Sequence, residues 1–482
     1  MAKIEKFRMF LTSNGVDTVT VDTQMDVMDA LNGSNMTIRQ IQDVTGLSPS
    51  NLYYVLKSLA ERRLIASYRE QGNVVYSAGC SVLLMASVAP DPDALNVAHG
   101  IALRIHSDWN ALIQSLKDII VLYARSIGID IQPMFLLAGR VLYHRNPDSF
   151  RFRDVGEFYS AIGGFGELSS SNISVVSYNP MRLAVVPKYP IDGEAQVLGN
   201  PNMGFILQAL AHNTGHRYRV TSWETGSILK IDLRPDTADS SSIVLDGSVL
   251  KGMEDLCSVP MDVGVVLTDD GPAVLSSRHI AILRSVEGGA RLQKIIDDTG
   301  MAKTTAFNNI NTLCEEGFTE SYEESGSVMY RSRSRVLFEP IGTPSQRDLG
   351  NIPGFGSDNY YFYVMDTVVN MFRWIRLDIS GLFFEAGRTM GSVLDDPDRD
   401  AADVLKDMTR PVSDLFRIGV ASLVPLRISL TFDPRVSDAS RDSIRTFVRG
   451  VVSEVLSRRA GCDHPITVDM AGREIVYEEG PR

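Results

Sequence analysis

The 482-residue sequence lacks the long apolar runs and the cysteine patterns that mark several large protein classes. No segment approaches the roughly 18 uninterrupted apolar residues of a membrane span, so we expect no membrane partner. The cysteines, only four and far apart, provide neither the spacing of a zinc knuckle nor a disulfide framework. We therefore expect reduced thiols and a cytoplasmic protein.

The chain also lacks a positive net charge and the short motifs of common enzymes. Its formal net charge is -12, so any contact with nucleic acid must come from a local patch of Lys and Arg. It has no nucleophile elbow, no phosphate-binding loop with its lysine and no zinc-protease histidine pair. His212 and His216 have helical spacing, but Gly215 interrupts them, and we interpret Gly163–Gly166 as a turn. We expect no enzyme, no cofactor and no metal site.

What the sequence does contain is an internal duplication. Thr45 to Ser77 matches Thr299 to Arg331 without a gap, each residue corresponding to the one 254 positions later. Asp118 to Arg140 matches Asp366 to Arg388 in the same way, 248 positions later. A repeat of this kind indicates that a small domain followed by a larger one occurs twice.

Segments rich in proline and glycine separate these units. We expect an α+β protein in which two small domains alternate with two larger α+β domains. The expected divisions are an N-terminal extension at 1–22, the small domains at 23–88 and 273–339, a linker at 340–357, and the larger domains at 95–267 and 358–482.

Local signals in the first small domain predict three helices. Thr37 with Gln40 is a capping-box pattern, and Gly46 is a natural helix stop. Ser48 followed by Pro49 is typical of the N-cap and first turn of the next helix.

The third predicted helix has an apolar stripe formed by Leu52, Leu56 and Leu59. Apolar residues recur at corresponding positions of the two copies, and on this basis we also place Tyr53 and Phe307 on the buried side. The remaining polar positions of the helix are expected to face outward.

Three helices followed by a hairpin around Gln71–Asn73 give the pattern of a winged helix-turn-helix. The stretch LSPSNLYYVLKSLAERRLI, which starts at Leu47, resembles the recognition helix and following strand of ArsR-like and MarR-like regulators. The resemblance implies that the third helix enters the major groove of double-stranded DNA while the hairpin touches the backbone. The side chains expected to contact DNA are Ser48, Ser50, Asn51, Tyr54, Lys57 and Arg69, and in the second copy Lys303, Thr304, Thr305, Asn308 and Asn311.

The two copies differ in charge. The segment 36–77 has a balance of +2, whereas 290–331 has a balance of -3. Negative charge opposes the approach of phosphate. The sequence therefore does not decide whether the second copy binds DNA or another protein.

Each larger domain contains long helical patterns and ends in a helix followed by two strands. The stretch FFEAGRTMG, at Phe383–Gly391, resembles part of the small-molecule sensing domains called 4-vinyl reductase domains. The resemblance implies an apolar ligand cavity. Arg140 and Arg388 could hold an anionic ligand there. Salt bridges to Asp130 or Asp378 explain the same repetition, and we favour them because buried charges need partners.

These patterns predict a prokaryotic transcriptional regulator that binds specific DNA sequences and responds to a small-molecule effector. Two similar units in one chain would imitate the two-fold dimer of such regulators, and a homodimer of whole chains stays open. The alternative is a protein-protein scaffold or adaptor that uses the same small domains without DNA. The operator, the effector and the sign of regulation do not follow from the sequence.

Overall fold

The computed structural model has mixed α and β content, with several small sheets, as expected for an α+β protein. The expected linker at 340–357 lies almost wholly outside the described residues. The structure describes residues 7–12, 15–31, 35–86, 90–107, 112–168, 171–187, 195–216, 218–224, 228–235, 263–341, 359–395, 416–423, 426–460, 466–469 and 474–479.

The first lobe comprises the described residues from 7 to 86. Its elements are β1 (Phe7–Thr12), β2 (Gly15–Val19), α1 (Asp22–Ala30), β3 (Met36–Thr37), α2 (Ile38–Thr45), α3 (Pro49–Glu61), β4 (Ile65–Glu70), β5 (Asn73–Ala78) and β6 (Ser81–Ala86). One sheet has the strand order β3-β5-β4. In the other, β1 lies between β2 and β6, and the short strand β7 (Ile129–Asp130) extends the edge.

The local signals of the sequence are confirmed in this lobe. Thr37 and Gln40 form the reciprocal capping box that starts α2, and Gly46 ends it in the left-handed region with φ of 67°. Ser48 accepts a hydrogen bond from the backbone N–H of Asn51, and Pro49 occupies the first turn of α3. The predicted hairpin is formed by β4 and β5.

The second lobe comprises residues 263–340 and follows the same order of elements, except that an isolated bridge between Ala290 and Tyr330 stands in place of β3. Its elements are β12 (Val263–Thr268), β13 (Gly271–Ser276), α10 (Ser277–Ser285), α11 (Leu292–Thr299), α12 (Lys303–Glu315), β14 (Thr319–Glu324), β15 (Ser327–Ser332) and β16 (Arg335–Pro340). Its larger sheet, β13-β12-β16-β17, has the strand order of β2-β1-β6-β7 in the first lobe, with β17 at Leu377–Asp378. Its hairpin consists of β14 and β15.

Two expected boundaries fall inside these sheets. The hairpin β1–β2 lies in the stretch expected to be an N-terminal extension, yet β1 pairs with β6 and buries Phe7, Met9 and Leu11. In the same way β12, expected in the first larger domain, pairs with both β13 and β16. The strands β1 and β6, and likewise β12 and β16, are more than 60 residues apart, so no local pattern marks these two pairings.

The first body comprises the described residues from 90 to 235, and the second body those from 359 to 479. The first contains α4 (Pro92–Ser107), α5 (Leu112–Ser126), α6 (Gln132–Arg145), the 3-10 turn Pro147–Ser149, α7 (Val155–Leu168), β8 (Ser171–Tyr178), β9 (Met181–Pro187), α8 (Ala195–Thr214), β10 (Tyr218–Glu224) and β11 (Leu229–Pro235). The second contains α13 (Tyr360–Trp374), α14 (Ser380–Leu394), β18 (Phe416–Leu423), β19 (Leu426–Phe432), α16 (Asp438–Ala460), β20 (Ile466–Asp469) and β21 (Glu474–Glu479). Gly163–Gly166 lies within α7, so the expected turn is wrong.

The two bodies share one hydrophobic core. A single cluster of buried residues draws members from both, and α13 of the second body packs on α6 of the first while α14 packs on α4 and α5. Tyr360 of α13, for example, meets Phe165 and Phe205 of the first body with ring-centroid distances of 6.2 and 6.1 Å. The fold therefore joins the two halves by apolar burial as well as by the chain itself.

Glycines allow the helices of each body to cross at very short distance. A Cβ on Gly139 of α6 would lie 1.9 Å from the carbonyl oxygen of Pro201, and one on Gly204 of α8 would lie 1.8 Å from that of Leu136. In the second body, Gly387 of α14 faces α16 in the same way, where a Cβ would lie 2.1 Å from a carbonyl oxygen. Close backbone packing thus explains why the Ala-Gly-Arg segment recurs.

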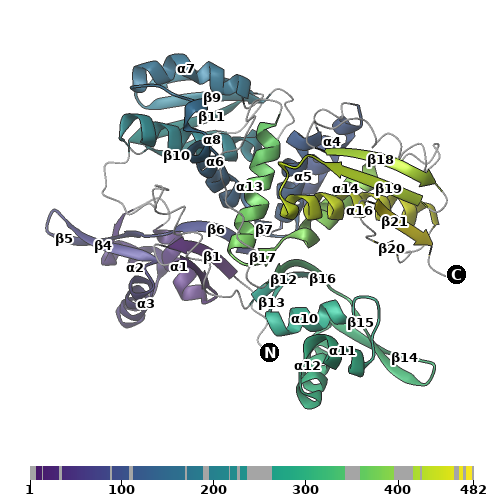
Figure 1. Ribbon diagram of the computed structural model, residues 1–482. Coiled ribbons are helices and arrows are strands. Elements are labelled where there is room, and N and C mark those ends of the chain that lie inside the picture. The colour runs from purple at the N-terminus through teal and green to yellow at the C-terminus, as the bar shows by residue number, and fades with distance from the viewer. Residues whose placement is uncertain are drawn as a thin grey trace.

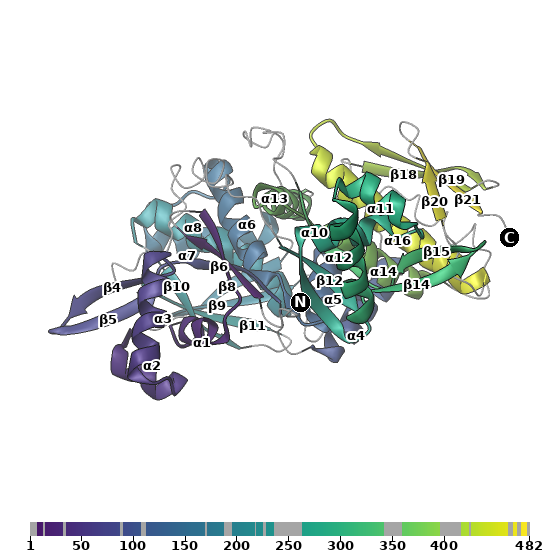
Figure 2. The same cartoon turned by 90° about the horizontal axis from the view of Figure 1, so that it is seen from below.

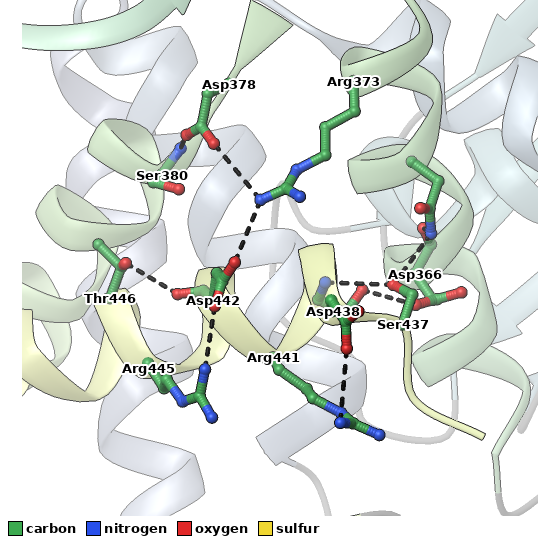
Figure 3. A network of polar contacts seen from close by, with 12 residues as sticks. Asp366, Arg373, Asp378, Ser380, Ser437, Asp438, Arg441, Asp442, Arg445 and Thr446 are labelled. Carbon is green, nitrogen blue, oxygen red and sulfur yellow. Dashed lines mark hydrogen bonds and ion pairs between the residues drawn. The ribbon is translucent and has the colours of Figure 1, made fainter. Parts of the chain in front are cut away.

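A buried carboxylate recurs at matched positions of α5 and α13 but has different partners. Asp118 is fully buried and forms an ion pair with the equally buried Lys117 at 2.5 Å. Asp366 instead accepts hydrogen bonds from the hydroxyls of Ser437 at 2.6 Å and Ser440 at 2.7 Å (Figure 3). Asp366 therefore fixes α13 to the start of α16, whereas Asp118 pairs with its own neighbour in α5.

The lobes lie on one side of the molecule and the bodies on the other (Figure 1). The hairpins β4–β5 and β14–β15 project outward in opposite directions, both in this view and from below (Figure 2). The third helices of the lobes, α3 and α12, are both on the lower side in Figure 1, away from the bodies.

Candidate nucleic-acid interface

The helix α3 presents a polar face because its apolar stripe is held in the core of the first lobe. Leu52, Leu56 and Leu59 are buried against α1 and β4. The side chains of the remaining positions project from the opposite side of the helix. The predicted contact residues of this helix, Ser48, Ser50, Asn51, Tyr54 and Lys57, are all exposed.

Two basic side chains of the first lobe are exposed and have no strong internal partners among the described residues. Lys57 approaches Glu61 only at 4.0 Å, a solvent-exposed contact between residues one helical turn apart. Arg69 is exposed on β4, close to the tip of the hairpin, where it is the register partner of Val74. Both cations are thus available to phosphate groups.

The second lobe exposes a less basic helix. Lys303, Thr304, Thr305 and Asn308 of α12 are exposed, and Asn311 is half-buried. The tip of its hairpin carries exposed Glu323 and Glu324. Hydroxyl and amide groups can still donate to or accept from base edges, although they attract phosphate less than a cation does.

The placement of Tyr53 and Phe307 on the buried side is wrong. The Tyr53 side chain is 60% exposed and Phe307 is 45% exposed, while neighbouring Tyr54 is 69% exposed. Each residue follows a buried one, Leu52 or Ala306, and one helical position turns a side chain by about 100°. An aromatic residue next to the apolar stripe therefore lies at the edge of the buried face. The similarity between the two copies did not reveal this exposure, because both copies have an aromatic residue at the same position.

Not every basic residue counted in the sequence is available to a partner. The Arg62 guanidinium, at the end of α3, donates to both carboxylate oxygens of Asp17 at 2.8 and 2.6 Å and to the carbonyl oxygen of Thr18 at 2.6 Å. It also donates to the side chain of Gln24 at 3.0 Å. This arginine therefore fixes α3 to the hairpin β1–β2, and sequence counting overstated the free charge of the lobe.

The expected salt bridge between Arg388 and Asp378 is wrong. Arg388 donates to Glu454 of α16 at 2.9 Å. Asp378 instead accepts the backbone N–H of Ser380 at the start of α14, at 2.7 Å, and lies 3.7 Å from Arg373 (Figure 3). Asp130 accepts the backbone N–H of Gln132 at 2.9 Å in the same way at the start of α6. The repeated aspartates thus form Asx turns just before the two helices, each accepting the backbone N–H two residues on.

An apolar cavity of about 20 Å³ lies where helices of the two bodies meet. Leu116 of α5, Phe383 of α14 and Ile444 of α16 line it together with residues of α13. This volume is near that needed for one water molecule. Arg388 and Arg140, the latter half-buried in α6, are not among its lining residues.

Glu385 of α14 connects the second lobe to both bodies. Its buried carboxylate accepts hydrogen bonds from Arg335 of β16 at 2.8 Å and from the hydroxyl of Tyr123 of α5 at 3.3 Å. Burial raises the pKa of Glu385 above its ordinary value of 4.5, although Arg335 and Arg388 oppose the rise. The residue at the matched position of the first body is Leu137, which is buried as well.

A Glu385→Gln variant should be more stable than the parent protein at pH 7. Because the folded-state pKa is raised, the folded protein binds this proton more tightly than the unfolded chain, and its stability falls as pH rises through that pKa. Glutamine removes this loss, so the gain in melting temperature should shrink as pH falls towards 4.5. Arg335, whose side chain is 47% exposed, stays hydrated in the variant.

Glu454→Gln is the matched control, with the opposite sign. Burial alone would raise the pKa of Glu454, but hydrogen bonds from Arg458 and Arg388 lower it overall. This variant should lose stability at pH 7, and the loss should vanish in acid. A Glu385→Gln variant that is less stable than the parent at pH 7 would show that its ion pair with Arg335 outweighs the cost of burial.

Among the described residues, no group of three or more His, Cys, Asp or Glu side chains is placed to hold a metal ion. Within the same ranges, no helix combines the length and apolarity needed to cross a bilayer. Cys80 and Cys314 are free thiols, while Cys257 and Cys462 lie outside the described residues. No protein-family model matches the chain, and no curated protein matches it either.

Proposed function

We propose that this protein is a sequence-specific DNA-binding transcriptional regulator of the cytoplasm. In this proposal each lobe is a winged helix-turn-helix, and the two lobes act as the halves of a fused dimer. One observation carries the proposal. The helices α3 and α12 lie on the same side of the molecule, and the hairpins of both lobes project outward (Figure 1). An elongated ligand could contact both lobes at once, and duplex DNA has this shape.

The electrostatics of the first lobe support the same proposal. Lys57 lies on the exposed part of α3, which also offers Ser50, Asn51 and Tyr54 as hydrogen-bonding groups, and Arg69 lies on the hairpin that follows the helix. Phosphate contacts from the cations would set the position of the helix, and the neutral groups would distinguish base edges. The negative net charge of the whole chain disfavours contact with DNA outside the lobes.

We further propose that the bodies are sensor domains of the 4-vinyl reductase type that respond to a small-molecule effector. A ligand that binds one arrangement of the bodies more tightly would shift the separation of the lobes. The junction at Glu385, which accepts hydrogen bonds from Arg335 of the second lobe and from Tyr123 of the first body, provides a physical connection for such a shift.

The test is selection of DNA from a random pool by the purified protein and by a Tyr54→Ala, Lys57→Ala, Arg69→Ala variant. The parent should enrich a defined motif, and the variant should bind it at least 10-fold more weakly. Loss of two cations should reduce the slope of log affinity against log salt by about 2. Arg153→Ala is the control, because this exposed arginine belongs to the first body.

If the parent protein enriches no motif even at low salt, the proposal fails. The lobes would then be modules that bind other proteins, as in a scaffold or adaptor. The acidic hairpin of the second lobe fits that alternative, because Glu323 and Glu324 would favour a basic partner.

A further inference from the structure

The two lobes share one surface feature that their charges do not predict. Tyr53 in α3 and Phe307 in α12 are 254 positions apart, at matched positions of the repeat, and both are exposed, by 60% and 45%. Each exposed ring leaves apolar surface in water, and a partner that covers it gains the free energy of burying that surface. Because the two rings occupy matched positions, we expect the same kind of apolar group of a partner to cover the ring in each lobe.

The neighbouring outward positions differ between the lobes. Tyr54 corresponds to Asn308, and Lys57 corresponds to Asn311. A hydroxyl is retained one turn before each ring, at Ser50 and Thr304, and both hydroxyl residues are exposed. The common element of the two helices is thus a hydroxyl and an aromatic ring at i and i+3, on adjacent positions of one helix face.

The side chain of Phe307 has no hydrogen-bonding group, which restricts what it can recognise on DNA. In the major groove the thymine methyl is the apolar feature of the base edges, whereas the other groups are donors or acceptors. Tyr53 at the matched position can make the same contact through the edge of its ring. The adjacent hydroxyl of Ser50 or Thr304 can reach a donor or acceptor beside that methyl.

We propose that Tyr53 and Phe307 each cover a thymine methyl group, one in each half of the DNA site, and that the second lobe reads DNA despite its negative charge. This inference rests on the proposed function and specifies its ligand. The DNA site then contains one such thymine in each half, at equivalent positions. The contacts on either side of the thymine differ between the two halves. Lys57 supplies a phosphate contact only in the first half.

The test replaces each thymine of the selected motif, one at a time, by deoxyuridine, which differs only in lacking the methyl group. Affinity of the parent protein should fall about 4-fold at one thymine in each half-site, the effect of one buried methyl. Phe307→Ala should abolish sensitivity at its own thymine and leave the other unchanged, and Tyr53→Ala should do the reverse. Tyr178→Ala, which removes an exposed ring of the first body, should change neither.

The outcomes separate this inference from the proposed function. Enrichment of a motif with no loss of affinity on any deoxyuridine replacement overturns the methyl contact and leaves the regulator in place. Sensitivity that only Tyr53→Ala removes overturns the assignment of Phe307 and of the second lobe. Enrichment of no motif overturns both proposals. The measurement on unmodified protein does not depend on the folding of any variant.

Discussion

Gly139→Ala is expected to destabilise the protein by about 3 kcal/mol, although it adds a single methyl group. The new Cβ would lie 1.9 Å from the carbonyl oxygen of Pro201 and 2.9 Å from the backbone nitrogen of Phe205. These are backbone atoms of α8, so no side-chain rotation can relieve the contact. The helices α6 and α8 must separate, which removes packing from the shared core.

The effect is measured as the shift of the urea unfolding midpoint, with Gly163→Ala as the matched control. Gly163 also lies in a helix, but nothing is within 4 Å of the position of its Cβ. There alanine should be neutral or stabilising by about 0.5 to 1 kcal/mol, since it has the better helix propensity. Equal midpoints for Gly139→Ala and the parent would show that α6 and α8 do not cross as closely as described.

Asp118→Leu is expected to destabilise the protein by about 3 to 5 kcal/mol. The side chain of Lys117 is 1% exposed and that of Asp118 is 0% exposed, so the substitution would bury an ammonium group without its counter-ion. The nearby ring of Tyr361, 4.8 Å from the lysine nitrogen, cannot replace a full negative charge. Unfolding of the variant should therefore begin at a much lower urea concentration.

Two further variants identify the cause of that loss. Adding Lys117→Met to Asp118→Leu removes both charges and should recover most of the stability, because an apolar pair needs no counter-ion. Asp148→Ala breaks an ion pair with Arg151 in which both side chains are more than 70% exposed, and it should cost less than about 1 kcal/mol. A double variant no more stable than Asp118→Leu would contradict the uncompensated charge as the cause.

Local structure could be predicted from the sequence where the causes are themselves local. The capping box at Thr37 and Gln40, the left-handed stop at Gly46 and the start of α3 at Ser48 each depend on residues within one helical turn. The hairpin β4–β5 depends on alternation and a short turn. These features need no knowledge of distant contacts, and the structure contains them where they were expected.

Features that depend on distant partners could not be predicted. The pairing of β1 with β6, and the role of Gly139 against Pro201, both require the tertiary arrangement. Asp378 was assigned to an arginine because buried charges need partners, yet the backbone N–H of Ser380 satisfies it locally. For the candidate interface, the apolar stripe of α3 predicted that its polar residues are exposed, as they are, whereas the exposure of Tyr53 depends on where the core ends.

The two lobes belong to one chain whose bodies share a core, and this has a consequence for how the lobes stay together at low protein concentration. Separate subunits lose translational and rotational freedom when they associate, and they come apart on dilution. Here one chain supplies both lobes, so the local concentration of one beside the other does not depend on how much protein is present. In a homodimer every substitution also appears twice. In this chain Lys57 and Asn311 occupy matched positions with different charge, so each lobe is free to diverge without changing the other.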